Sequence, residues 1–177
     1  KGNYRVLLWQ GLWGSDVIIE INQTYKEDPV LRDIFRDVRF RKAMSLAINR
    51  NEVNQMLYFG LGVPRQTTVI PQSPYYEESF AKAYIEYNPQ EANKLLDEMG
   101  LKKGSDGYRI RPDGKRLEIL LEYTPEAIRG KIAEMLIHYW DAIGVKVAAK
   151  EISNELQRSR AMGGLIQMGF WSGDRCA

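Results

Sequence analysis

The sequence predicts an α/β fold in which a mixed sheet is flanked by helices. Two kinds of pattern carry this prediction: short segments with a period of two, such as 17–22 and 117–123, and longer segments whose apolar residues recur at helical spacing. A third observation is the order strand, helix, strand over residues 117–150, because such a unit crosses over right-handedly and pairs its strands in parallel. With 177 residues, 44% of them hydrophobic, the chain is expected to form a single domain over residues 1–177.

The first third of the chain predicts two strands followed by three helices. Residues 4–9 and 17–22 alternate in hydropathy and are expected to pair with each other. Asp28-Pro29 offers an N-cap followed by proline at the first helical position, which predicts the start of a helix. Asp37 is expected to cap a second helix, and Asn51 a third helix that ends at the glycines that follow.

The middle of the chain predicts a loop, a helix and a hairpin. Three prolines within residues 60–76 exclude a regular element, so this segment is expected to be an extended loop. Asn88-Pro89 predicts the cap and first residue of the next helix. Asp113-Gly114 then predicts the turn of a hairpin whose arms are residues 108–110 and 117–123.

The last third supplies the crossover unit. Thr124-Pro125 is expected to open a long helix, which Gly144 closes in the usual C-terminal position. Trp140 lies within this helix and is expected to pack in the core or at the edge of its apolar stripe. A strand follows directly over residues 145–150, and the apolar stretch 165–171 predicts one further strand.

Composition excludes several classes of protein. Lysine and arginine number 25 against 23 acidic residues, and the net charge of +2 is too small to indicate a nucleic-acid partner. No apolar run reaches the roughly eighteen residues that a membrane-spanning helix needs. Cys176 is the one cysteine, and the lone His138 has no neighbour at metal-ligand spacing. The sequence therefore predicts no metal site and no cofactor.

The chain opens at Lys1 without an initiator methionine or a signal-peptide pattern. This is typical of an excised piece, so we expect any targeting segment to lie upstream of it.

An ordered set of motifs resembles the family 5 extracellular solute-binding proteins, the oligopeptide- and dipeptide-binding group. The most characteristic stretch is Val38-Arg-Phe-Arg-Lys-Ala43 followed by Ala47-Ile-Asn-Arg50. Further matches follow in the same order as in the family: Tyr58 to Pro64, Pro71 to Tyr75, Asn88 to Ala92, Asp113 to Lys115, and Ile143 to Val147. The chain departs from the family at Asn49, where aspartate is usual, and at Gln167, where aspartate is frequent.

The resemblance implies one lobe of a periplasmic-binding-protein-like type II fold, corresponding to the family's second large lobe, the C-terminal-type lobe of a larger two-lobed protein. It also implies the substrate-binding component of a bacterial ABC importer, located in the periplasm or elsewhere outside the cytoplasm, with membrane anchoring as a lipoprotein left open. The two lobes would close around the ligand and present it to the permease subunits. The implied partners are therefore the missing first lobe, the permease and a peptide or oligosaccharide ligand, and no enzymatic activity is expected.

Aromatic and polar residues at the ends of predicted strands and in loops are the candidate ligand-binding residues. The tryptophans Trp9, Trp13 and Trp171 lie where core packing explains a ring poorly, and such rings stack on sugars or cap peptide side chains. A structural role for Trp13 and Trp171 stays equally open. In the proline-rich loop, Arg65 and Gln66 are candidates for a ligand carboxylate or hydroxyl, and surface exposure alone is the alternative. Asn22, at a predicted strand end, is a further polar candidate.

Basic residues gather over positions 36–42, with Asp33 and Asp37 among them to offset the charge. This cluster is interpreted as a solvated face with local ion pairs, and contact with the permease or the partner lobe is the alternative. Its members are Arg36, Arg39, Arg41 and Lys42.

Two other function classes stay open at this point. The first is an enzyme domain of hydrolase type, for which Glu118, Glu122 and Glu151 are available without a diagnostic spacing. The bare S-x-x-K match at Ser79 and Lys82 has no companion motif, and a pair on the surface of a helix explains it as well. The second class is a protein-interaction module without a small ligand.

Overall fold

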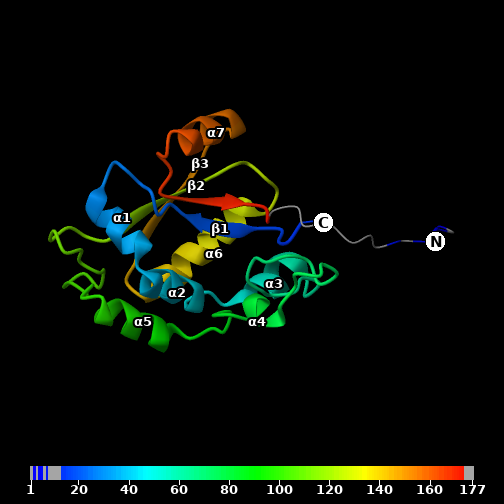
Figure 1. Cartoon of the computed structure of the whole chain (residues 1–177), viewed down its shortest axis with the longest axis horizontal. Coiled ribbons are helices and arrows are strands. Elements are labelled where there is room, and N and C mark those ends of the chain that lie inside the picture. Colours follow the sequence, from blue (N-terminus) through cyan, green and yellow to red (C-terminus); the bar gives the residue numbers. More distant parts are fainter. Residues whose placement is uncertain (1, 3, 6, 8–12, 174–177) are drawn as a thin grey trace.

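Four strands form one mixed sheet in the computed structural model, which describes residues 2, 4, 5, 7 and 13–173. Their order across the sheet is β1-β4-β2-β3, so the described part of the sheet has β1 and β3 at its edges (Figure 1). β2 pairs in parallel with both β3 and β4, whereas β1 pairs antiparallel with β4. The strand bounds are β1 Ile18–Ile21, β2 Glu118–Tyr123, β3 Lys146–Glu151 and β4 Met168–Trp171.

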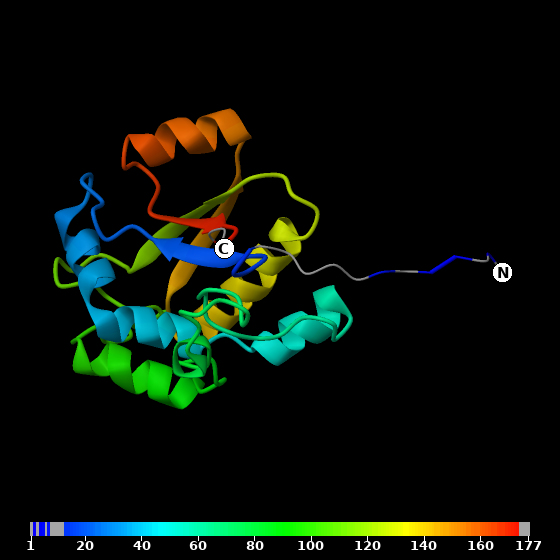
Figure 2. The ribbon, with the colours of Figure 1, turned by 45° about the vertical axis from the view of Figure 1, so that its right-hand side comes forward.

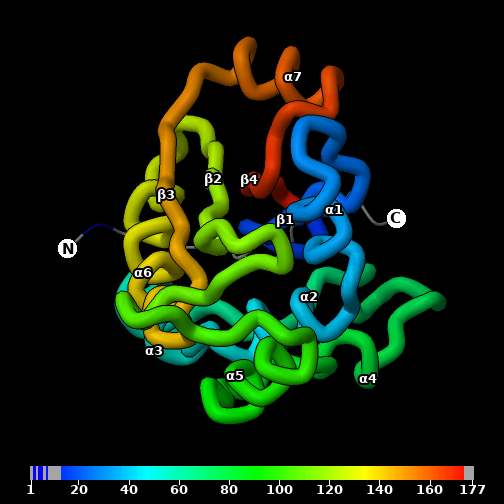
Figure 3. The backbone as a smooth tube through the Cα atoms, turned by 90° about the vertical axis from the view of Figure 1, so that its left-hand side faces the viewer, coloured from blue at the N-terminus to red at the C-terminus, as the bar shows by residue number. Residues whose placement is uncertain are grey.

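Helices pack against the sheet and form a further layer beside it. α6 packs against β2 and β3, and α2 lies between the sheet and α5, which is the outer helix on that side (Figure 2). α7 lies at the opposite end of the molecule (Figure 3). The helix bounds are α1 Pro29–Arg36, α2 Val38–Leu46, α3 Arg50–Tyr58, α4 Glu78–Ala81, α5 Pro89–Glu98, α6 Arg129–Ala142 and α7 Asn154–Met162. The predicted mixed sheet flanked by helices, with its parallel crossover pair, is confirmed.

The core lies between the sheet and α6, and it follows the predicted alternation. Leu117, Ile119 and Leu121 are at most 1% exposed, whereas Glu118 between them is exposed. On α6 the predicted stripe is buried as well, and Trp140 is fully enclosed as expected for a core residue. The period of two in β2 and the helical period in α6 therefore aim their apolar faces at each other.

Three predicted helix starts are confirmed by their capping bonds. The Asp28 carboxylate accepts a hydrogen bond from the Leu31 N–H at 3.0 Å, and Asn88 does the same for the Glu91 N–H at 3.0 Å. Asp37 accepts from the Arg39 N–H at 2.8 Å. These bonds satisfy donors that the first helical turn leaves without an intrahelical partner.

Two predicted helix starts are wrong by a few residues. α3 is capped by Asn49, whose side-chain oxygen accepts from the Glu52 N–H at 3.2 Å, so Asn51 lies inside the helix. α6 begins at Arg129 rather than after Thr124-Pro125. The Thr124 hydroxyl is engaged elsewhere, because it accepts from Arg129 Nη1 at 2.6 Å and donates to Glu126 at 3.2 Å.

The hairpin turn at Asp113-Gly114 is confirmed, but its first arm is shorter than expected. The Arg111 N–H donates to the Lys115 carbonyl at 2.8 Å, and Gly114 adopts a φ of +80°, which favours glycine. Residues 108–110 form only isolated bridges instead of a strand. The strand expected over residues 4–9 lies largely outside the described residues, so its pairing stays a prediction; the described partner of β1 is β4.

Two helices were not predicted. α7 follows Ser153, whose hydroxyl accepts from the Leu156 N–H at 3.2 Å, and Glu155 lies in its first turn. That capping pattern is the signal that the sequence offered. α4 has only four residues and no side-chain cap, so its sequence carries no comparable signal.

Candidate functional site

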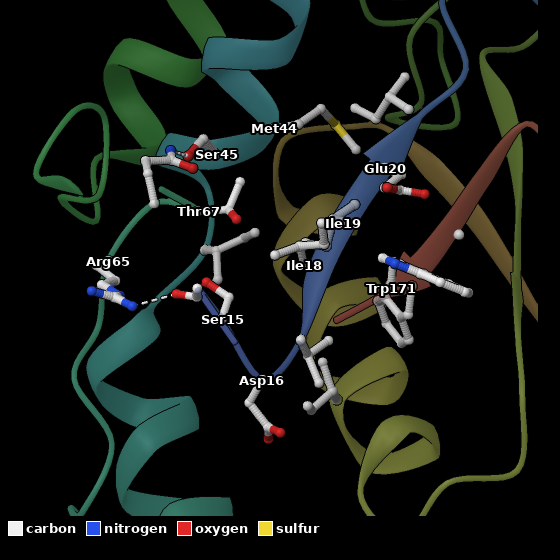
Figure 4. Close-up of a pocket in the computed structure, with 18 of the residues that line it drawn as sticks. Ser15, Asp16, Ile18, Ile19, Glu20, Met44, Ser45, Arg65, Thr67 and Trp171 are labelled. Carbon is white, nitrogen blue, oxygen red and sulfur yellow. Dashed lines mark hydrogen bonds between the residues drawn. The ribbon is translucent and has the colours of Figure 1, made fainter. Parts of the chain in front are cut away.

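A broad, open cavity with a volume of about 1930 Å³ surrounds the edge strand β1. All residues from Trp13 to Thr24 line it, and the opposite walls come from α2, from residues 62–67 and from α7. Figure 4 shows β1 with Ser45 of α2 and with Arg65 and Thr67 of the loop. Ile18 and Ile19 point to opposite faces of the sheet, yet both line the cavity. The cavity therefore wraps around the outer edge of β1 instead of covering one face only.

The register of the sheet shows which backbone groups of β1 face this space. The Asn22 N–H donates to the Gln167 carbonyl of the neighbouring strand segment at 2.9 Å. Hydrogen-bonding direction alternates along an antiparallel pair, so the N–H and C=O groups of Ile19 and Ile21 point away from β4. Within the described part of the chain, β1 has no second neighbouring strand. These groups are available to an extended ligand backbone.

The side chains of β1 and β4 divide between the core and the cavity floor. Ile19 lies opposite Phe170, which is 1% exposed, and this pair packs in the core. Ile18 lies opposite Trp171, which is 49% exposed and lines the cavity (Figure 4). An apolar side chain and a half-exposed indole therefore lie side by side on the surface that a ligand would contact.

Five of the six predicted ligand-binding residues line the cavity, and the sixth, Trp9, lies outside the described residues. Trp13 is 47% exposed, so about half of its surface is accessible. Arg65 donates through Nη2 to the Gly14 carbonyl, which attaches the loop to the start of β1. Gln66 donates from its backbone to Ala81 at 2.8 Å and from Nε2 to the Ser45 hydroxyl at 2.8 Å.

Asn22 lines the cavity with its hydrogen-bonding capacity already used. Its amide nitrogen donates to the carbonyls of Gly164 at 3.2 Å and Ile166 at 2.8 Å. Its oxygen accepts from the N–H and the hydroxyl of Thr24, both at 2.9 Å. A primary amide offers two donors and about two acceptor sites, so Asn22 connects β1 to the segment before β4 with no spare bond for a ligand.

Two polar groups at the cavity were missed by the sequence reasoning. The Ser45 hydroxyl accepts from Gln66 and from Arg50 Nη2, each at 2.8 Å, and donates to the Tyr84 carbonyl at 2.8 Å. The Tyr58 hydroxyl donates to Asp16 at 2.7 Å. Burial and this bond raise the pKa of Tyr58, so it remains a protonated donor. Neither pairing has a spacing that a sequence pattern reveals.

The basic cluster on α1 and α2 divides in the structure. Arg39 forms the expected local ion pair with Asp37 at 2.6 Å. Arg41 and Lys42 instead line the cavity, so part of the cluster faces the site rather than bulk solvent alone.

The residues considered for hydrolytic chemistry do not assemble there. Glu122 is 1% exposed and pairs with Arg160 at 2.8 Å, and neither Glu118 nor Glu151 lines the cavity. Lys82 pairs with Glu78 at 2.7 Å and makes no hydrogen bond to Ser79 among the described residues. Within residues 13–173 and the four described positions before them, no cluster of metal-ligating side chains is present. No helix described there is long and apolar enough to cross a membrane.

Comparison with known proteins gives concordant relatives. An oligopeptide-binding protein OppA of known structure superposes with a TM-score of 0.92 at 44% identity, covering 99% of this chain and 28% of that one. The oligopeptide-binding protein OppA of Lactococcus lactis subsp. lactis is 33% identical over 147 residues, 82% of this chain and 24% of the relative. A probable ABC transporter-binding protein of Deinococcus radiodurans is 35% identical over 122 residues, 68% of this chain and 20% of the relative. The chain thus spans between 20% and 28% of their lengths.

These relatives are solute-binding proteins rather than enzymes, and the superposition confirms the type II periplasmic-binding-protein-like fold. The model of the bacterial extracellular solute-binding proteins, family 5 Middle, matches residues 13–174, which is nearly the whole chain. The cavity lies within the matched segment, and the motifs that suggested the family are part of it. The chain belongs to the family 5 bacterial extracellular solute-binding proteins.

Proposed function

We propose that this chain is the second large lobe of a two-lobed receptor that binds peptides outside the cytoplasm and delivers them to an ABC permease. The free edge of β1 inside the cavity is the observation that carries the proposal. Ile19 and Ile21 direct backbone donors and acceptors toward the space where a ligand would lie. An extended peptide adds to such an edge as a further strand, and its main chain supplies the complementary groups at the matching spacing.

The edge favours a peptide over an oligosaccharide. The hydroxyl groups of an oligosaccharide do not repeat at the spacing of a β-strand. In an extended peptide, the main-chain donors and acceptors of every second residue point to the same side at that spacing. The half-exposed rings of Trp13 and Trp171 support either ligand, because an indole stacks on sugar and also packs against peptide side chains. The aromatic residues do not distinguish the two kinds of ligand, so the backbone geometry of β1 is what favours a peptide.

Closure of two lobes would complete the site. The cavity is broad and open, so this chain alone encloses a ligand only in part. Contacts from a second lobe would stabilise the closed state, and the closed state would be recognised by the permease. The partners in this proposal are the first lobe, the permease subunits and the peptide. The receptor would lie in the periplasm or be attached through a lipid to the outer face of the membrane.

Isothermal titration calorimetry on the two-lobed protein tests the proposal. Short peptides should bind, and oligosaccharides of similar size should not. Peptides N-methylated at alternate residues should bind on the order of tenfold more weakly for each main-chain hydrogen bond removed. Binding of the sugars, or equal affinity for methylated and unmethylated peptides, would contradict strand addition at β1.

A further inference from the structure

The lining of the cavity is more positively charged than the chain as a whole. Among the described residues that line it, six are cationic and three are acidic, an excess of three positive charges. The entire chain of 177 residues has a net charge of only +2. Its positive excess is therefore concentrated at the site. The cationic residues are Arg41, Lys42, Arg50, Arg65, Lys82 and Arg158, and the acidic ones are Asp16, Glu20 and Glu78.

Most of these cations contact neutral groups rather than acidic side chains. Of the six, Lys82 is the member found among the ion pairs of the described residues, with Glu78. The Lys42 ammonium lies 4.5 Å from the centre of the Tyr84 ring. Arg41 donates to two main-chain carbonyls at 2.7 Å. Such partners satisfy N–H donors without cancelling the charge, so the positive potential persists in the cavity.

Arg50 is a partly buried cation whose hydrogen-bond partners are neutral. Its guanidinium donates to the carbonyl and the hydroxyl of Ser45, at 2.9 and 2.8 Å. Burial lowers its pKa to about 10, partly offset by the charge of Glu86, so the group is still protonated at neutral pH. A desolvated cation of this kind gains more from an approaching anion than an exposed one does.

The charges lie on both sides of the edge strand. Arg41, Lys42, Arg50 and Arg65 come from α2, α3 and the following loop, and Arg158 comes from α7. Figure 3 shows β1 between α7 at one end and α2 and α3 at the other. A strand-like ligand along β1 would send alternate side chains toward these two walls.

We infer that this lobe selects peptides by their carboxylates, so that the receptor prefers acidic over basic peptides. The inference rests on the proposed function, because it concerns the charge of a peptide bound along β1. The carboxylates can belong to acidic side chains or to a free C-terminus, and both would meet the same cationic walls. Arginine is suited to this task because its planar fork of donors matches a carboxylate.

Calorimetry on the two-lobed protein separates these sources. Three peptides of one length carry glutamate, glutamine or lysine at the same positions, each with a free and an amidated C-terminus. The glutamate peptide should bind at least about tenfold more tightly than the lysine peptide, and added salt should reduce this ratio. The difference in affinity between the free and the amidated peptide measures the contribution of the C-terminal carboxylate to binding.

Substitutions then assign the preference to this lobe. The variants Lys42→Gln and Arg158→Gln should each lower the ratio of glutamate-peptide to glutamine-peptide affinity several-fold. Lys131→Gln is the matched control, since Lys131 is exposed on α6 and does not line the cavity, and it should leave the ratio unchanged. Equal binding of glutamate and lysine peptides overturns the charge inference and leaves peptide binding intact. Failure of every peptide to bind overturns the proposed function and the inference with it.

Discussion

The indole N–H of Trp140 donates a hydrogen bond to the main-chain carbonyl of Met44, 3.0 Å away. Trp140 belongs to α6 and is fully buried, whereas Met44 lies on α2 and lines the cavity. The bond thus connects the helix beneath the sheet to the helix that forms a cavity wall. The next residue, Ser45, positions Gln66 and Arg50, so the orientation of the site depends on this contact in the core.

Replacing Trp140 by phenylalanine should lower the free energy of unfolding by about 2–4 kcal/mol. The substitution leaves the Met44 carbonyl buried without its partner and opens a small cavity, and both effects destabilise. Urea denaturation followed by circular dichroism measures the change. Trp171→Phe is the control, because Trp171 is half exposed and should cost no more than about 0.5 kcal/mol. Equal losses in the two variants would contradict the role of the Met44 bond.

Arg109 is predicted to be the polar residue on which the fold depends most. It is 0% exposed, and its guanidinium donates to the carbonyls of Ile143 at 2.8 Å and Asn93 at 3.2 Å and to the Asp97 carboxylate at 2.7 Å. Arg109→Met should cost about 3–5 kcal/mol, since the carbonyls and the carboxylate lose their common partner. The same denaturation experiment measures it. Arg116→Met, at a half-exposed arginine nearby, should cost less than about 1 kcal/mol.

These two residues show what a sequence pattern can and cannot predict. Trp140 was expected in the core or at the edge of an apolar stripe because it lies within the long helix, and local periodicity contains that information. Arg109 falls in a short hairpin arm, and its partners lie 8 to 34 residues away in the chain. No local rule relates such positions. The helix caps at Asp28, Asp37 and Asn88 were found from their local patterns, whereas the starts expected at Asn51 and at Thr124-Pro125 were wrong by a few residues, so a cap residue followed by proline does not by itself mark a helix start.

The stability of the chain should fall in acid, partly through Asp28. Burial raises the pKa of Asp28, but hydrogen bonds from Arg111 and the Leu31 N–H outweigh it and lower the pKa below its ordinary value of 3.8. A lowered folded pKa stabilises the protein above pH 3.8, and this contribution is lost as the pH falls through the folded pKa. Asp28→Asn keeps a capping oxygen and removes the charge. It should cost about 1–2 kcal/mol at neutral pH and flatten the decline below about pH 4.

Urea midpoints measured from neutral pH to about pH 2 give this curve for both proteins. The control is Asp33→Asn, because the Asp33 side chain is 67% exposed and its contact with Arg32 lies at the surface. If the urea midpoint of Asp28→Asn declined with falling pH in parallel with that of the unmodified protein, the acid sensitivity would not come from Asp28.

Ser45→Ala should weaken peptide binding more than it destabilises the fold. The Ser45 hydroxyl accepts from both Gln66 and Arg50, so its loss removes one hydrogen bond from each of these cavity-wall side chains, while the bond from Arg50 to the Ser45 carbonyl remains. We expect peptide affinity in the two-lobed protein to drop about threefold to tenfold, while stability changes by about 1 kcal/mol. Calorimetry and urea denaturation measure the two quantities. An unchanged affinity would show that Gln66 and Arg50 need no positioning by Ser45.

The candidate site was predictable in its residues but not in its geometry. Trp13 and Trp171 were singled out because core packing explains their rings poorly, and Arg65 and Gln66 because polar side chains in the proline-rich loop could reach a ligand carboxylate or hydroxyl; all four line the cavity. The pairing of β1 with β4 could not be foreseen, because the sequence suggested residues 4–9 as a partner of β1 and gave no signal for a strand so distant in the chain. Strand order depends on contacts between segments about 150 residues apart, which lie outside any periodic pattern.

The isolated 177-residue chain should fold yet bind peptide far more weakly than the two-lobed protein. Its core, capped helices and central sheet are formed by its own residues, so cooperative unfolding is expected. The cavity, however, is open, and the contacts of a second lobe would be missing from the bound state. Calorimetry should therefore give an affinity at least about a hundredfold lower, a loss of roughly 3 kcal/mol. Equal affinity of the chain and the two-lobed protein would mean that this lobe alone carries the binding energy, and closure would then add a signal to the permease without adding affinity.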